Sequence, residues 1–496
     1  MRDGSPAFEL NASEPETRSP RRPSIPGIAV LVVSNAPVAR SSPLPVVVVR
    51  LRKEFLAPGT PSAVDRNRRW LIAWGLGYAA VGGASVLVPL YAIALDASLA
   101  FVGLIAATAA LVGVPGALAW AALAAKTHRR RPFVLVALGA TAGVLALVPL
   151  ATTPAAVLAL NAALWFVVAA AVPVLNLIVV EGAPVEEWDG RIASLNAWQG
   201  YGWVAGLVVG TAWTLAVPRF GVAPIRGQRL LFLVLAVVAT AALLLARVWY
   251  PEPSTVSAER FRRVYDRLSR SNWGAGRYLR ASLYGPTRVF WGLRTLGNGT
   301  RPRRESAGVP NPLAGFSPSL RRYVLAVVVF SLGFAVFWGP VPAFLAERVD
   351  DGAVFAVYLA GNLGSAVCYG PAGRLAGKYA PRSVQAAALA GRAGLFPGVA
   401  FVALVLPALA GFSLVFGLIG VTWAVIAITS ASIVTRLADD GNRGAALGVQ
   451  AAAAGLATAV GSALGGVVAG AAGYLPTFGL GAALVLTGLV LVMLAR

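Results

Sequence analysis

The chain carries one pattern of residues twice, with the second copy 252 positions after the first. The matched pairs are Leu123 and Leu375, Ala124 and Ala376, Lys126 and Lys378, Arg130 and Arg382, and Arg191 and Arg443. Each copy follows apolar runs that are too long for the helices of a soluble protein. A duplicated set of membrane-length runs, with the same charges between them, predicts a membrane protein built from two related halves.

The composition supports a membrane protein with many spans. Of the 496 residues, 57% are hydrophobic and 12% are charged, whereas a soluble domain carries roughly 25% charged residues. The net charge of +22 does not indicate nucleic-acid binding, because the basic residues lie in short clusters between apolar runs. Cys368 is the single cysteine and His128 the single histidine, so neither an internal disulfide nor a His/Cys metal centre is expected. No cofactor is predicted.

Twelve apolar runs have the length of a membrane span, about 20 residues each. The first six lie at 70–94, 99–125, 133–151, 155–180, 193–216 and 229–249. The second six lie at 323–346, 353–377, 383–405, 408–434, 444–470 and 474–494. The predicted fold class is an all-α polytopic membrane protein, with twelve transmembrane helices in two pseudo-symmetric six-helix halves, residues 66–250 and 323–496. Pro89 and Pro340 are predicted bending points in the first and seventh spans.

The positions of the basic residues predict the orientation. With both termini in the cytoplasm, most arginines and lysines between the spans fall on the cytoplasmic side. The residues that fall outside are Arg219, Arg226, Arg229 and Arg348. We therefore expect a multi-pass protein of the plasma membrane with cytoplasmic termini. Residues 1–65 are rich in Pro, Ser and Arg and are predicted to form a disordered tail, unless the protein begins downstream, for example at Val64.

A long basic segment, residues 251–322, separates the two halves and holds fourteen arginines. Within it, Phe261, Val264 and Leu268 follow helical spacing, with arginines between them. This pattern predicts an amphipathic helix that lies on an anionic lipid surface. A flexible cytoplasmic tether is the alternative interpretation.

Six spans, a long basic loop and six further spans resemble the major facilitator superfamily of transporters, over residues 66 to 496. The resemblance is carried by the loops after the second and eighth spans, Ala121–Arg130 and Gly373–Arg382. In that family the loop reads roughly Gly-x-Leu-Ala-Asp-Arg-x-Gly-Arg-Arg and helps to lock the cytoplasmic gate. Both copies here keep the cations but lack the acid, since Ala125 and Gly377 stand at the family's Asp position.

The resemblance implies a cytoplasmic gate made of residues in these loops and in the loops after the fourth and tenth spans. The predicted gate residues are Lys126, Arg129, Arg130, Gly373, Lys378, Arg382, Asp189, Arg191, Asp440 and Arg443. Acids such as Glu187 and Asp189 are candidates to replace the missing Asp; otherwise the lock is weaker than in the family. A further alternative is that the basic pairs serve only as a topology signal.

Glycines at four-residue spacing mark one face of the fifth span and one face of the eleventh. They are Gly202, Gly206 and Gly210 in the fifth span, and Gly461 and Gly465 in the eleventh. Such a face lets helix backbones approach closely. Close packing is the predicted role, and sliding against the eighth and second spans is the functional alternative.

In the resembled fold, the first, fourth, seventh and tenth spans line a substrate cavity. The predicted cavity residues, with additions from the fifth, eighth and ninth spans, are Trp74, Tyr78, Asn161, Asn176, Trp198, Gln199, Trp338, Asn362, Arg392 and Trp423. Buried amides need partners, so several of these are expected to bond to neighbouring helices instead. Arg392 is the one charge clearly embedded in a span, and it either extends to the membrane surface or contacts an anionic substrate or a carboxylate. No Asp or Glu lies at the centre of a span, which leaves a coupling ion open.

These features predict a secondary transporter that moves a small organic solute by alternating access, with efflux of a hydrophobic, drug-like compound favoured. One alternative is an uncoupled facilitator of a neutral solute, and another is a non-transporting membrane receptor or scaffold. An enzyme is not expected, because His128 sits among arginines and the only local acid cluster is Glu186, Glu187 and Asp189. The expected partners are the organic solute and anionic lipid at the central loop, without nucleic acid, and the chain is expected to be a monomer.

Overall fold

Long α-helices follow one another along the chain in the computed structural model, which describes residues 69–126, 131–180, 187–250, 316–439 and 443–495. The helices of the first half are α2 (Arg69–Ala94), α3 (Leu99–Lys126), α4 (Arg131–Leu147), α5 (Pro154–Val180), α6 (Trp188–Ala216) and α7 (Pro224–Trp249). Those of the second half are α11 (Pro318–Trp338), α12 (Val341–Ala346), α13 (Asp351–Lys378), α14 (Pro381–Val402), α15 (Ala408–Leu437), α16 (Arg443–Ala472) and α17 (Tyr474–Leu494). Short 3-10 helices, η2 (Val148–Leu150) and η4 (Val217–Phe220), extend α4 and α6, so every regular element in these ranges is helical.

The helices have the length and composition of membrane spans. Within the described ranges, eleven helical stretches are long and apolar enough to cross a membrane, judged by length and composition alone. In addition, α3 contains the shorter apolar stretch Leu99–Gly113, although the helix itself has 28 residues. The predicted all-helical, multi-span fold class is confirmed. The predicted tail, residues 1–65, and most of the predicted linker lie outside the described residues.

Three helices begin five residues before the predicted spans. The first residues are Trp188 in α6, Pro224 in α7 and Pro318 in α11, where the apolar runs predicted 193, 229 and 323. The runs missed these first turns because charged residues occupy them, as Arg191 does in α6. In α11, the Ser317 Oγ accepts a hydrogen bond from a backbone N–H three residues later, at 3.2 Å, which caps the helix. The predicted end of the linker at residue 322 is therefore too late.

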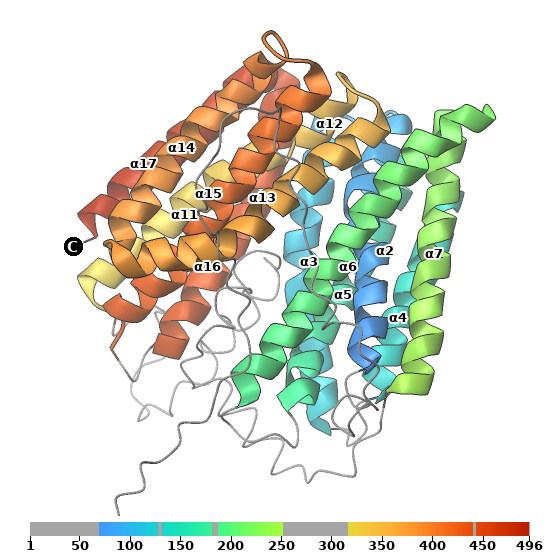
Figure 1. Cartoon of the computed structure of the whole chain (residues 1–496), viewed down its shortest axis with the longest axis horizontal. Coiled ribbons are helices and arrows are strands. Elements are labelled where there is room, and N and C mark those ends of the chain that lie inside the picture. Colours follow the sequence, from blue (N-terminus) through green and yellow to red (C-terminus); the bar gives the residue numbers. More distant parts are fainter. Residues whose placement is uncertain (1–68, 127–130, 181–186, 251–315, 440–442, 496) are drawn as a thin grey trace, which may run out of the picture. The chain divides into compact units, whose positions relative to one another are not determined.

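The two halves use the same set of helix pairings. In the first half α2 packs on α6 and α7, α3 on α5, and α4 on α5 and α7. In the second half α11 packs on α16 and α17, α13 on α15, and α14 on α15 and α17. In Figure 1 the first half is drawn from blue to green and the second from yellow to red. Since α2 corresponds to α11 and α3 to α13, each pairing of the first half recurs in the second.

The duplicated prolines have different effects on the two equivalent helices. Pro89 lies inside α2, which continues to Ala94. Near Pro340 the chain breaks instead, because α11 ends at Trp338 and the short helix α12 begins at Val341. The predicted span 323–346 lies within one membrane-length stretch, Pro318–Ala346, which consists of two helices with the break at the predicted bending point Pro340. The short helix packs against α2 and α3 of the first half and against α13, so tertiary contacts accompany the break.

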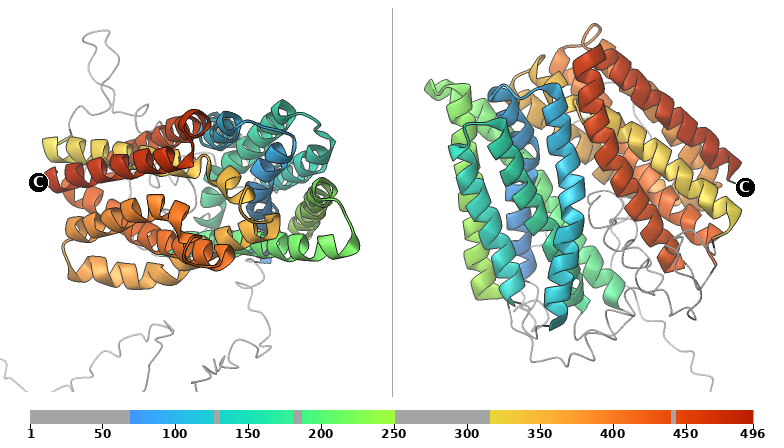
Figure 2. Two further views of the ribbon diagram at one scale, coloured as in Figure 1. Left: turned by 90° about the horizontal axis from the view of Figure 1, so that it is seen from above. Right: turned by 180° about the vertical axis from the view of Figure 1, so that it is seen from behind.

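The two halves meet through two long-helix pairs, α3 with α16 and α6 with α13. Figure 2 shows α3, in blue, beside α16, in red, when the molecule is seen from behind. For the description below, the end of the helices where α2 passes into α3 is called the Asp96 end. The opposite end, where α13 stops, is called the Lys378 end.

Candidate functional site

A cavity of about 370 Å³ lies among the helices of the second half. It is lined by α11, α13, α14, α15 and α16, and its walls lie near the middle of these helices. The lining includes the predicted cavity residues Trp338, Asn362, Arg392 and Trp423, which the structure therefore brings together. Its volume lies within the range of ligand sites, roughly 300–1,000 Å³.

Arg392 is the only charged residue among the described residues that line this cavity. It stands halfway along α14, and its side chain is buried, with 2% of its surface exposed. It therefore does not extend to a helix end, which contradicts one of the two predicted arrangements. Its Nε and Nη1 atoms have no hydrogen-bond partner among the described residues.

Aromatic rings surround the guanidinium group of Arg392. Its Cζ atom lies 4.3 Å from the ring centroid of Phe334, 5.5 Å from that of Trp423 and 5.8 Å from that of Phe396. A guanidinium over the face of a ring is attracted by the ring quadrupole. The rings also hold one another: Phe396 stacks on Phe337 with centroids 4.0 Å apart, and Phe334 meets Trp423 edge to face.

Several polar side chains in the cavity wall are already engaged by the protein. The Asn362 Nδ2 atom donates to the carbonyl oxygen of Tyr358 at 2.9 Å. The Ser430 Oγ atom accepts a hydrogen bond from Gln385 at 2.7 Å. These contacts fix the wall, whereas Arg392 has two buried nitrogen atoms that lack a hydrogen-bond partner among the described residues.

The sequence analysis missed several lining residues, among them Phe334, Tyr358 and Gln450. Two of them stand four residues before predicted ones, since Phe334 precedes Trp338 and Tyr358 precedes Asn362. Residues four apart share one face of a helix, so this spacing is the signal that could have found them.

The predicted cavity residues of the first half do not line this cavity. They are Trp74, Tyr78, Asn161, Asn176, Trp198 and Gln199. The Nδ2 atom of Asn161, on α5, donates to the carbonyl oxygen of Ile105 on α3 at 3.2 Å, so this amide bonds to a neighbouring helix. Asn176 is buried, and Trp198 is half-buried where α6 approaches Gly75 of α2.

Other polar donors are buried on α2 and α6. The rings of Trp74 and Tyr78 lie 5.4 Å apart on α2. The Nε1 atom of Trp74 and the side-chain amide nitrogens of Asn196 and Gln199 have no hydrogen-bond partner among the described residues. The first half therefore also offers unpaired donors, although they are not part of the described cavity.

At the Asp96 end the two halves are in close contact. A Cβ atom placed on Gly103 of α3 would lie 2.5 Å from the carbonyl oxygen of Ser462 and 2.8 Å from the Cα atom of Gly466, both on α16. A Cβ atom on Gly210 of α6 would meet the ring of Phe355 on α13. Side chains larger than hydrogen would therefore separate the halves at these points.

A hydrogen bond also joins the two halves at this end. The Nε2 atom of Gln228, on α7, donates to the Oδ2 atom of Asp351, the first residue of α13, at 2.7 Å. Gln228 is 5% exposed, and Asp351 is half-buried. The bond joins a neutral amide to an acidic side chain across the contact between the halves.

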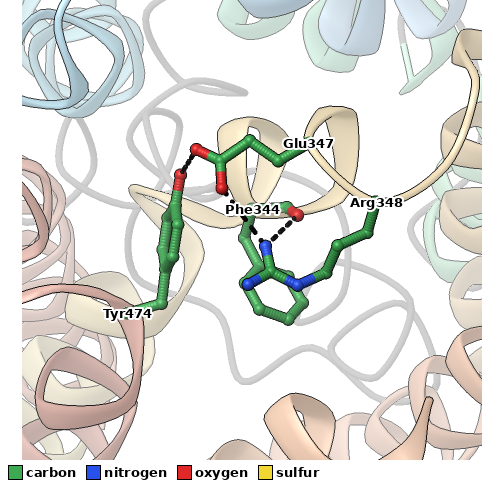
Figure 3. A network of polar contacts seen from close by, with 4 residues as sticks. All are labelled: Phe344, Glu347, Arg348 and Tyr474. Carbon is green, nitrogen blue, oxygen red and sulfur yellow. Dashed lines mark hydrogen bonds and ion pairs between the residues drawn. The ribbon is translucent and has the colours of Figure 1, made fainter. Parts of the chain in front are cut away.

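The short helix α12 is attached to the second half by a small polar network, which Figure 3 shows. Tyr474 of α17 donates a hydrogen bond to Glu347, just after α12. Arg348 forms an ion pair with Glu347 at 3.3 Å and lies over the ring of Phe344, with its Cζ atom 3.9 Å from the centroid. This network holds α12 on α17 while α12 itself packs against α2.

At the Lys378 end, three of the described gate residues make contacts within their own half. Arg191 forms an ion pair with Glu187 of the same helix at 3.0 Å. The Nε atom of Arg443 donates to the carbonyl oxygen of Thr435 at 3.0 Å, and Lys378 lies over the ring of Tyr379. Arg382 is half-buried, and Gly373 is exposed with open space around it. Lys126, Arg129, Arg130, Asp189 and Asp440 lie outside the residues whose side chains are described.

The predicted glycine faces touch more than one neighbour. Cβ atoms on Gly202 and Gly206 would meet the backbone of α2, within the first half, whereas Gly210 faces α13 of the other half. Cβ atoms on Gly461 and Gly465 would likewise meet the backbone of α11, within the second half. Four of these five glycines therefore hold helices of one half together rather than facing the partner half.

Comparison with known proteins identifies the family to which the chain belongs. The model of the Major Facilitator Superfamily matches residues 70–417. No curated protein sequence was found that matches the chain. The solved structure of the nucleoside transporter NupG is similar, with a TM-score of 0.60 at 12% identity over 87% of this chain and 99% of that one. A bacterial homolog of the human lysosomal transporter Spinster, in its inward-facing and unoccupied conformation, has a TM-score of 0.58 at 14% identity over 88% of this chain and 96% of that one.

At these identities the two structures show a shared fold, and the family match covers most of the chain. The helix order, the repeated pairings and the cavity among membrane-length helices agree with that match. The chain therefore belongs to the Major Facilitator Superfamily and is a multi-pass membrane transporter of a small-molecule solute.

Proposed function

We propose that this transporter exports an amphipathic organic compound by alternating access, and that the aromatic cavity of the second half is its substrate site. The observation that supports the site is the cavity itself, about 370 Å³ in volume, near the middle of membrane-length helices. Rings of Phe334, Trp338 and Trp423 line it. Such a wall favours a substrate with a flat apolar body, because aromatic surfaces bind through buried area and ring contacts.

The contacts between the halves support the transport cycle that we propose. The close contacts described above, at Gly103, Gly210 and Gln228, all lie at the Asp96 end. By the distribution of arginines, this end faces outward and the Lys378 end faces the cytoplasm. The structure then corresponds to a transporter that is closed to the outside, and rocking of the halves about the substrate site would open the Asp96 end.

A ligand screen on the purified protein tests the proposed site. A panel of amphipathic aromatic compounds is tested for an increase in melting temperature, because a ligand that binds only the folded state stabilises it by about 2.7 kcal/mol at 100 times its Kd. Trp338→Ala should abolish the increase, while Phe220→Ala, a surface aromatic that is 80% exposed, should keep it. Equal stabilisation of the wild type and Trp338→Ala would place the substrate site elsewhere.

The direction of transport and its energy source need a transport assay. Compounds that stabilise the protein are loaded into proteoliposomes, and their steady-state distribution is measured with and without a pH gradient. Proton-coupled export predicts accumulation against a concentration gradient only when the pH gradient is present.

An uncoupled facilitator of a neutral solute is the second candidate. The observation in its favour is that neither Asp nor Glu occurs among the described residues that line the cavity. Membrane-embedded acids are common carriers of coupling protons. Equal steady-state distributions with and without the pH gradient would support this candidate and contradict proton-coupled export. The predicted lipid and scaffold roles of residues 251–322 fall mainly on residues outside the described part of the chain and stay predictions.

A further inference from the structure

We infer that the substrate carries an anionic group, and that Arg392 binds this group inside the aromatic cavity. The inference rests on the proposed function, because it names the chemical class of the compound that the cavity takes. Three observations carry it: the burial of the guanidinium group, the lack of a hydrogen-bond partner for its Nε and Nη1 atoms among the described residues, and the place of Arg392 in the wall of the cavity.

A buried cation normally has a compensating acid. Charged side chains inside a membrane protein are costly, and they pair with one another or with backbone carbonyls. The guanidinium of Arg392 lies close to the rings of Phe334, Phe396 and Trp423. The Nε and Nη1 atoms have no hydrogen-bond acceptor among the described residues.

Five acids of the described residues stand at helix ends, whereas Arg392 stands halfway along α14. Glu347, Asp350 and Asp351 stand at the Asp96 end, and Glu187 and Asp439 stand at the Lys378 end. None of them lines the cavity, whose described walls hold Arg392 as their single charge. Cation–π contacts orient the guanidinium but accept no hydrogen bonds, so its buried Nε and Nη1 donors remain unpaired among the described residues.

The geometry defines what this ligand looks like. A planar oxyanion such as a carboxylate matches the fork of donors on a guanidinium group. The same group is flanked by rings, which form the apolar surface for an aromatic body attached to the oxyanion. The cavity therefore fits an aromatic carboxylate better than an inorganic anion, which would leave the aromatic wall uncovered.

Paired probes test the anionic group. The probes are naphthalene-2-carboxylate and its neutral amide, naphthalene-2-carboxamide, and the Kd of each is measured by calorimetry on the full-length protein. For the wild type we expect the carboxylate to bind about 10- to 100-fold more tightly than the amide, as a charge-assisted contact in a buried site predicts. Arg392→Met should reduce this ratio to about one while it keeps the amide affinity, and Arg392→Lys should keep part of the preference.

Controls separate binding of the anion from loss of the fold. Arg321→Met removes an exposed arginine from α11 outside the cavity wall, and it should leave both affinities unchanged. Without ligand, Arg392→Met should melt at a higher temperature than the wild type, because the change removes an unpaired buried charge. An arginine that serves only to hold the rings together would instead lower the melting temperature when replaced, and the ratio of affinities would not change.

Three results would overturn the inference, and they differ in whether the cavity remains the proposed substrate site. Equal Kd values for the two probes on the wild type, or an unchanged ratio in Arg392→Met, would refute the anionic group while the cavity remained the site. Sodium chloride that stabilises the protein as well as the carboxylate does would indicate a simple ion site. An amide affinity that Trp338→Ala does not change would remove the proposed substrate site, and the inference would fail with it.

Discussion

The hydrogen bond between Gln228 and Asp351 should contribute to the equilibrium between closed and open states at the Asp96 end. The two atoms are 2.7 Å apart, and the bond crosses from α7 in one half to α13 in the other. A hydrogen bond to a charged group contributes about 1.5–3 kcal/mol. Asp351 is only half-buried, so solvent screens the bond and the lower end of this range, about 1.5 kcal/mol, is the appropriate figure. Loss of the bond should then shift the equilibrium about tenfold toward the state that is open at this end.

A double-mutant cycle isolates the energy of this bond. Gln228→Ala and Asp351→Ala are made singly and together, because Asp351 also lies in the first turn of α13, where its charge interacts favourably with the helix dipole. The populations are measured by spin-label distances between Phe220→Cys and Leu404→Cys, at exposed positions of the Asp96 end, with Cys368 replaced by serine. The reasoning would be refuted by a coupling energy under about 0.3 kcal/mol, which is within the error of additivity for independent sites.

Three further predictions concern packing and the two ends of the molecule. Gly465→Ala should destabilise the protein by about 1–3 kcal/mol, because the new Cβ atom meets the backbone of α11. Gly479→Ala, where the new Cβ atom has open space around it, should be neutral or slightly stabilising. The melting temperatures of the two variants are compared. Tyr474→Phe removes the hydrogen bond to Glu347 and should raise the open population at the Asp96 end by a factor of about 2–10, and an unchanged spin-label distribution would contradict this role. Gly377→Asp introduces the acid of the family motif at a position with open space around it. It should increase the population that is closed at the Lys378 end, as measured by spin-label distances at that end. A slower transport rate with unchanged populations would argue against a gate at this position.

The spans could be predicted because the membrane imposes a length on each apolar run. The sequence did not predict how strongly each of the two bending points would interrupt its helix. Pro89 and Pro340 occupy equivalent places in the duplicated sequence, yet α2 continues and the second copy divides into α11 and α12. The short helix lies against α2 and α3 of the other half, and such contacts are not visible in one segment of sequence.

Four of the ten predicted cavity residues line the cavity of the second half, and the way in which the helices bring them together was not predictable. Arg392 was recognisable as the single embedded charge, but its neighbours come from separate helices: Phe334 from α11 and Trp423 from α15. Sequence spacing reports which residues share a helix face, not which helices face each other. The glycines show the same limit, since Gly206 and Gly210 lie one turn apart on α6 and face different halves of the molecule.

The close contact between Gly103 of α3 and Gly466 of α16 lies near one end of α3 and is a candidate pivot for this helix. With 28 residues, α3 is about 42 Å long, and its close contact with α16 lies one turn from its start. A rotation of α3 by about 10° around Gly103 would move the far end of the helix by about 6 Å, given its length. At the glycines themselves the backbones would barely shift. In the proposed transport cycle, a methyl group added at Gly103 is therefore expected to change the position of the opposite end of α3.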